Sequence, residues 1–228
     1  MKLIYLILFV SIFCKTYSQC KCESNPDLKD RISCDVTNFK NHAKLYWQYN
    51  CDSSWLVFES RNGKKKILIS FDSAVIDLTE RLGYIYTAEY KSTFLVLHNV
   101  ISGCCDPAEF ILFNKETGDE EQDLGRLIFY SENPKYPYVV YFGGNKPDNQ
   151  DVDYNFLIVQ NIDNNKIFRK ALPKNRIIKT LEFSTELFAE YLFDDPFLKG
   201  NVLVLPYRFK TDSTEDSWSN AKISIVLK

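Results

Sequence analysis

The residues after position 30 alternate between short runs of apolar and aromatic side chains and clusters of polar turn residues. The runs are rich in β-branched and aromatic residues, which fit the pleated, half-buried surface of a β-strand. Two of them, residues 55–59 and 66–71, flank Arg61-Asn62-Gly63, and Asn-Gly is the strongest short signal for a β-hairpin. This pattern predicts an all-β fold.

The same plan recurs along the chain. Residues 110–113 and 126–130 flank a turn at residues 115–118 with an acidic extension, and residues 154–160 and 166–172 flank an asparagine-rich turn. Each hairpin follows one more apolar run, and a fourth such run precedes a closing strand; these are residues 45–49, 94–99, 138–143, 202–207 and 222–227. A unit of one strand and one hairpin thus occurs about four times.

The spacing of these units favours a propeller-like arrangement. Their first strands start 49, 44 and 64 residues apart, and the first two intervals match the ~40–50-residue period of propeller blades. The longer interval contains residues 184–193, where apolar side chains repeat at helical spacing. We therefore expect a β-propeller-like fold with at most one or two short helices, closed by residues 32–39 lying beside residues 222–227. A large β-sandwich is the alternative that the same strands allow.

The first residues have the pattern of an export signal. Lys2 precedes an apolar run over residues 3–13, which is too short for a helix that crosses a bilayer. Ser18 offers a small side chain before a cleavage site between Ser18 and Gln19. A lipid anchor is disfavoured, because large residues precede both Cys14 and Cys20. We expect residues 1–18 to be a signal peptide and the mature chain to be secreted or periplasmic, without a membrane span.

No shift in composition divides the remaining chain. We interpret residues 19–30 as an N-terminal tether and residues 31–228 as a single all-β domain. Removal of the signal leaves 26 basic and 30 acidic residues, a net charge of −4. Such a balance gives no general attraction to nucleic acid, which is therefore not an expected partner.

Six cysteines remain after the signal is removed. In an oxidising compartment we expect them to form disulfides that attach the tether to the body, although the sequence does not choose the pairing. A zinc site or a redox role is disfavoured because no C-x-x-C spacing is present. The disulfide candidates are Cys20, Cys22, Cys34, Cys51, Cys104 and Cys105.

Candidate catalytic groups are few. His98 ends a predicted strand six residues before Cys104, but a histidine in such a place is more often packed than paired with a thiolate. Acidic clusters fall at predicted turns, where carboxylates are usually solvated, and residues 148–153 lack the spacing of an EF-hand. The nucleophile elbow, the phosphate-binding loop and the His-Glu-x-x-His motif are all absent from the sequence. We expect no cofactor, no metal and no catalytic residue.

Aromatic residues make up 15% of the chain, and most fall in predicted strands, where packing accounts for them. Trp47, Trp55 and Trp218 are instead candidate stacking residues for a sugar ring, with His98 as a fourth ligand-binding candidate. The sequence predicts an exported, non-catalytic binding or interaction module with an unknown protein or glycan partner. Two alternatives stay open: a carbohydrate-active enzyme using paired carboxylates, and an envelope-associated structural or interaction protein.

Overall fold

The structure is a computed structural model that describes residues 35–49, 53–72, 84–98, 107–143, 152–173, 176–184, 188–214 and 217–227. These residues form four antiparallel sheets, in each of which consecutive strands are neighbours. The prediction of an all-β fold is confirmed. Within the described ranges no helix is long and apolar enough to cross a membrane.

Three of the sheets have four strands and the last has three. The first sheet contains β1 (Thr37–Asn38), β2 (Lys44–Tyr49), β3 (Ser53–Glu59) and β4 (Lys65–Asp72). The second contains β5 (Tyr84–Glu89), β6 (Thr93–His98), β7 (Glu109–Asn114) and β8 (Glu120–Arg126). The third contains β9 (Phe129–Tyr130), β10 (Tyr138–Gly143), β11 (Asp153–Asn161) and β12 (Ile167–Ala171). The fourth contains β13 (Phe197–Lys199), β14 (Val202–Lys210) and β15 (Trp218–Val226), and it follows the helix α4 (Arg176–Phe183) and the 3₁₀ turn η2 (Ala189–Leu192).

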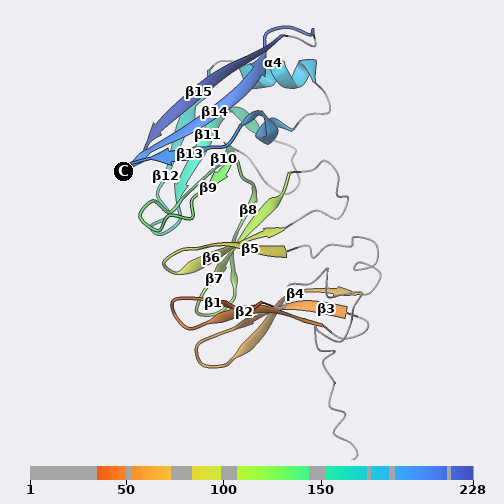
Figure 1. The fold of residues 1–228 in the computed structure, drawn as a ribbon, viewed down its shortest axis with the longest axis vertical. Coiled ribbons are helices and arrows are strands. Elements are labelled where there is room, and N and C mark those ends of the chain that lie inside the picture. The colour runs from red at the N-terminus through yellow and green to blue at the C-terminus, as the bar shows by residue number, and fades with distance from the viewer. Residues whose placement is uncertain are drawn as a thin grey trace, which may run out of the picture.

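The four sheets follow one another along the long axis of the molecule, from β1–β4 at one end to β13–β15 at the other (Figure 1). Separate apolar clusters fill the spaces between them: one joins the first and second sheets, one the second and third, and one the third, the fourth and α4. Phe94 shows how tightly the first of these packs, because its ring is fully buried and lies 4.7 Å from Phe39 and 5.5 Å from Phe113, centroid to centroid. Each sheet is therefore held by side chains of its neighbours.

Polar turns add a second connection between the first three sheets. Lys115 Nζ lies 2.8 Å from Glu89 Oε1, and the two side chains are only 5% and 13% exposed. The same carboxylate oxygen accepts a hydrogen bond from the backbone N–H of Lys40 in the first sheet's turn. The backbone N–H of Lys91 donates to Asp163 in a turn of the third sheet. These bonds fix the turns of three sheets to one another.

Each predicted unit of one strand and one hairpin corresponds to a single sheet, represented by β2–β4, β6–β8 and β10–β12. Of the first strands, β5 and β13 were not predicted, whereas β1 and β9 lie inside the segments predicted at residues 32–39 and 126–130 but pair with β2 and β10. Two of these strands, β1 and β9, have only two residues, which is too short for an alternating pattern. The acidic extension at residues 120–126 is itself the strand β8, whereas Phe129 and Tyr130 belong to the next sheet, so the predicted hairpin partner at residues 126–130 is wrong.

Two other predictions also need correction. The α-helix among the described residues is α4, which precedes the predicted segment at residues 184–193. Within the described part of that segment, residues 189–192 form a short 3₁₀ turn, and residues 185–187 lie outside the described part. In the described residues, β1 pairs with β2 and β15 with β14, so residues 37–38 do not close a ring with residues 222–227. The propeller class stays a prediction, and the stack of four sheets differs from a two-sheet sandwich.

Candidate functional site

The six cysteines predicted to form disulfides lie outside the residues that the structure describes. Their pairing therefore stays a prediction, as do the signal peptide at residues 1–18 and the tether at residues 19–30. Most of the acidic segment at residues 148–153 also lies outside the described part.

The three tryptophans do not share a surface. Trp47 in β2 packs against the core between the first two sheets and stacks on Phe71 with ring centroids 6.1 Å apart. Trp55 in β3 donates a hydrogen bond from Nε1 to Gln48 Oε1 at 3.1 Å. Trp218 lies in β15, at the opposite end of the stack (Figure 1). The three side chains therefore do not form one platform.

His98 ends β6 and is half-buried. Burial lowers its pKa, and the negative charge of Asp123 opposes this effect only in part. The carboxylates of the neighbouring acidic cluster have structural partners, since Asp119 pairs with Lys66 and Asp123 accepts a hydrogen bond from the backbone N–H of Gly125. Because Cys104 is outside the described residues, a pair of His98 with this thiol stays untested.

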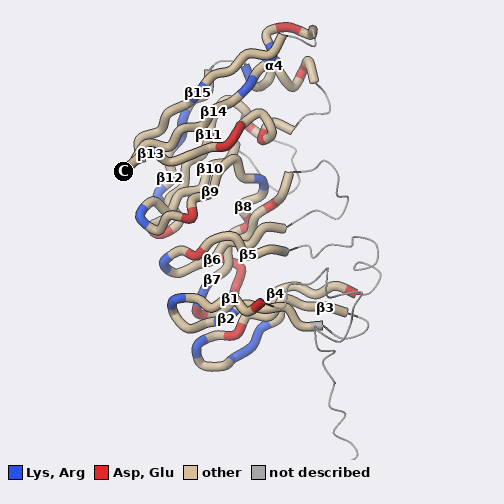
Figure 2. Tube along the Cα trace, in the orientation of Figure 1, with Lys and Arg blue, Asp and Glu red and all other residues tan. Residues whose placement is uncertain are grey.

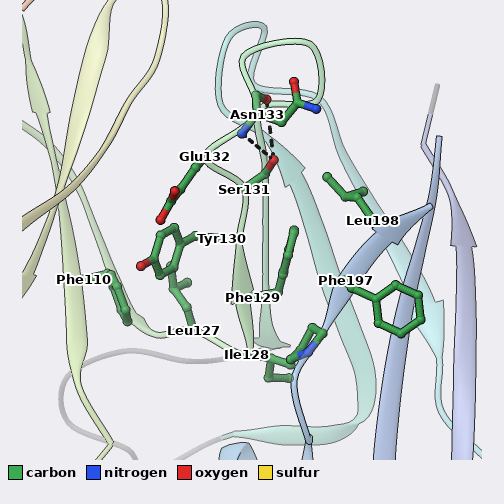
Figure 3. A pocket seen from close by; sticks show the side chains of 11 residues that line it. Phe110, Leu127, Ile128, Phe129, Tyr130, Ser131, Glu132, Asn133, Phe197 and Leu198 are labelled. Atoms are coloured by element: carbon green, nitrogen blue, oxygen red, sulfur yellow. Dashed lines mark hydrogen bonds between the residues drawn. The ribbon is translucent and has the colours of Figure 1, made fainter. Parts of the chain in front are cut away.

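A groove of about 500 Å³ opens beside β9 and β13. Figure 3 shows Phe110, Tyr130 and Glu132 on one side, Leu198 on the other, and Phe129 between them. The ring of Tyr130 packs on that of Phe110 with centroids 5.4 Å apart. Burial raises the pKa of the Tyr130 hydroxyl, and the charge of Glu132 raises it further. The groove thus combines aromatic walls with one exposed carboxylate, a combination that suits an apolar ligand carrying hydrogen-bond donors.

The outer face of the fourth sheet is a second candidate surface. In β14 the side chains of Leu203, Leu205 and Tyr207 are buried in the core, so their neighbours in sequence point away from it. The strand register places the outward residues of β15 beside those of β14 without interruption. An open depression of about 660 Å³ lies over this face. The apolar side chains of the whole outer face are Phe197, Val202, Val204, Pro206, Trp218 and Val226, and its charged ones are Lys199, Arg208, Lys210 and Lys222.

Trp218 lies among the cations of this face. Its ring is 5.1 Å from the guanidinium carbon of Arg208 and 5.4 Å from Lys210 Nζ, and the side chain is 38% exposed. Cations at such distances are attracted to the electron-rich face of an indole ring. The turn that follows β14 carries Asp212, whose pKa is lowered mainly by a hydrogen bond from Thr214 and also by the charge of Lys210. Figure 2 shows how the basic positions recur along the fourth sheet.

Sequence patterns alone did not point to this face. The alternation of apolar and polar residues in residues 202–210 was the available signal, but the gathering of the four cations depends on the register between β13, β14 and β15. Sequence patterns also missed Glu190, a partly buried carboxylate whose pKa is raised by burial, an effect that the charge of Arg126 opposes. Arg126 in turn packs its guanidinium 4.7 Å from the centre of the Phe188 ring.

No family model, no curated protein and no solved structure matches the chain.

Proposed function

We propose that this chain is an exported binding module that recognises an acidic segment of a partner protein through the outer face of its fourth sheet. The observation that supports this most directly is the composition of the face. Four cations stand among exposed apolar side chains, and its described residues include no carboxylate; the cations are Lys199, Arg208, Lys210 and Lys222. Such a surface is stabilised when a partner covers its apolar area and supplies the opposite charge.

The exposed side chains support the same proposal. Phe197 is 48% exposed, Trp218 is 38% exposed and Val226 is 56% exposed, all on one face. Tryptophan and arginine are among the residue types that dominate binding energy at protein interfaces, and here Trp218 and Arg208 are neighbours. None of the salt bridges among the described residues involves the four cations, although the charge of Lys210 also acts on Asp212 in the adjacent turn.

The concentration of positive charge is local. The mature chain predicted from the sequence carries a net charge of −4, yet all the charged side chains described on this face are basic. A basic face on an acidic protein orients an approaching acidic segment toward that face, and the attraction weakens as salt screens it. The export signal predicted at residues 1–18 is consistent with an action outside the cytoplasm.

Isothermal titration with a synthetic peptide of alternating glutamate and valine, about ten residues long, tests the proposal. We expect the Glu-Val peptide to bind and a matched Lys-Val peptide not to bind. Arg208→Glu and Lys222→Glu should each weaken binding about tenfold, because each turns an attraction into a repulsion. Lys64→Glu is the control, since Lys64 is an exposed cation in a turn of the first sheet. Equal binding of the two peptides, or full affinity in both sheet variants, would contradict the proposal.

Sugar binding in the groove beside β9 is a second candidate function. It is favoured by the groove's volume of about 500 Å³ and by the carboxylate of Glu132 next to aromatic walls. A glycan array should then give signals that Glu132→Gln abolishes, whereas Lys222→Glu leaves them intact. Glu132 is exposed, so its substitution leaves the core untouched. An array without signals, or signals that survive in Glu132→Gln, would argue against this candidate.

A further inference from the structure

Among the described residues, the fourth sheet has three strands, whereas each of the other sheets has four. In the first three sheets the third strand is hydrogen-bonded to a fourth, namely β4, β8 or β12. β15 is the third strand of its sheet and, among the described residues, pairs only with β14. No described strand therefore pairs with the second edge of β15, whereas the corresponding edges of β3, β7 and β11 are paired with β4, β8 and β12.

The hydrogen-bonding groups on this edge can be identified from the register. The N–H of Leu227 donates to the carbonyl of Asn201, and the N–H of Thr211 donates to the carbonyl of Ser217. Bonded and non-bonded pairs alternate in an antiparallel ladder, so the odd-numbered residues of β15 exchange bonds with β14. The N–H and carbonyl groups of the even-numbered residues, including Lys222 and Ser224, consequently point to the open edge.

β15 also lacks the features that usually keep an edge strand from pairing. Natural edges are short, charged or bulged. β8 has three carboxylates and two register shifts, and β12 has only five residues. β15 pairs with β14 over nine residues without a register shift, and Lys222 is its only charged residue. A long, regular and weakly charged edge is a template for another strand.

We propose that an extended acidic segment of a partner protein adds to β15 as a fourth strand. This inference rests on the proposed function and specifies how the partner is held. Charge favours an acidic segment over a second copy of the chain. Pairing two β15 strands would place two basic faces side by side, whereas an acidic strand would neutralise the positive charge of one basic face. Backbone hydrogen bonds between β15 and the added strand provide the affinity, and the basic face selects the side chains of that strand.

The geometry also fixes the pattern of the added strand. Residues directly opposite each other in an antiparallel pair have side chains on the same face. An outward side chain opposite Lys222 meets the basic face, so an acidic residue belongs there. Side chains on the other face extend the core surface of Ile223 and Ile225, which are buried, so apolar residues belong there. Alternating acidic and apolar residues satisfy both faces.

Proline substitution tests the edge without changing the basic face. Ser224→Pro removes an N–H that points to the open edge and leaves the bonds to β14 in place. We expect the affinity for the Glu-Val peptide to fall at least about tenfold. Ala171→Pro is the matched control: Leu172 N–H bonds to Asn155, so the N–H of Ala171 points to the outer edge of β12. Binding should persist in this control.

A modified peptide supplies a test that does not depend on how a variant folds. In antiparallel addition the glutamates of the peptide face outward, and their N–H groups bond to β15. N-methylation of the glutamates should therefore abolish binding to the unmodified chain, whereas N-methylation of the valines should be tolerated. Equal tolerance of both modifications, or full affinity in Ser224→Pro, would overturn strand addition. If Arg208→Glu and Lys222→Glu still weaken binding about tenfold in that case, the proposed function stands and only the binding mode is wrong.

Sedimentation of the chain without peptide tests the competing occupant. We expect a monomer at all concentrations examined. A concentration-dependent dimer that Ser224→Pro dissociates and Ala171→Pro does not would assign the edge to a second copy of the chain and overturn the proposal of an acidic partner.

Discussion

Removing the carboxylate of Glu89 is predicted to destabilise the fold strongly. Glu89→Ala leaves Lys115 Nζ without the oxygen that lies 2.8 Å away, although the Lys115 side chain is only 5% exposed. It also removes the acceptor of the Lys40 backbone N–H. Breaking a buried ion pair by removing one partner costs about 3–5 kcal/mol. At ~2–4 °C per kcal/mol for a domain of this size, the midpoint of thermal unfolding should fall by about 6–20 °C.

Urea unfolding of a small set of variants measures this effect. Glu89→Leu combined with Lys115→Met removes both charges and should recover at least about half of the lost free energy of unfolding, because apolar residues of similar volume replace buried ion pairs well. Arg61→Ala breaks the exposed pair with Glu116 and should cost less than about 1 kcal/mol. A loss below about 1 kcal/mol in Glu89→Ala, at an unchanged denaturant slope, would refute the structural role of the buried pair.

Three further predictions concern other parts of the chain. Gly118→Ala should lower the free energy of unfolding by several kcal/mol more than Gly63→Ala in urea titrations. Both glycines have a positive φ, but only at Gly118 would an added Cβ meet a buried side chain, 2.5 Å from Cδ1 of the Phe58 ring. Similar losses in the two variants would contradict this close contact. Burial raises the pKa of Glu190, so the ionised form of this side chain opposes folding. Glu190→Gln should therefore raise the midpoint of thermal unfolding at pH 7, but not at a pH below 4.5, the ordinary pKa of a glutamate. An equal gain at both pH values would contradict this effect of burial. Intact-mass spectrometry of the exported protein should show a chain that begins at Gln19 and gains mass on reduction, and six free thiols would exclude the predicted disulfides.

The long strands were predictable from sequence because apolar alternation and turn residues act locally. Residues 138–143 were predicted with the bounds that β10 has in the structure, and Asn62-Gly63 correctly indicated the β3–β4 hairpin. β8 was missed as a strand because its sequence is acidic; it is a strand because it pairs with β7, and the buried side chain of Leu124 packs between the second and third sheets. Pairing with neighbours thus overrides a weak intrinsic preference.

The candidate site was harder to predict from the sequence than the strands were. Tryptophan content suggested a stacking platform, but Trp47 is used in packing and Trp55 is hydrogen-bonded within the first sheet, at the end of the stack opposite Trp218. The basic face arises from residues of three strands, and the open edge follows from the absence of a fourth strand in the described part of one sheet. Both are properties of pairing between strands, which periodicity along one strand does not reveal.

Residue-resolved hydrogen exchange, with and without the Glu-Val peptide, tests most directly whether the fourth sheet is the binding surface. The amides of Asn220, Lys222 and Ser224 point to the open edge, so we predict fast exchange in the free chain and slow exchange in the complex. The amide of Ala171 at the edge of β12 should not change. Slow exchange of the β15 amides already in the free chain, or protection only elsewhere in the complex, would contradict the account.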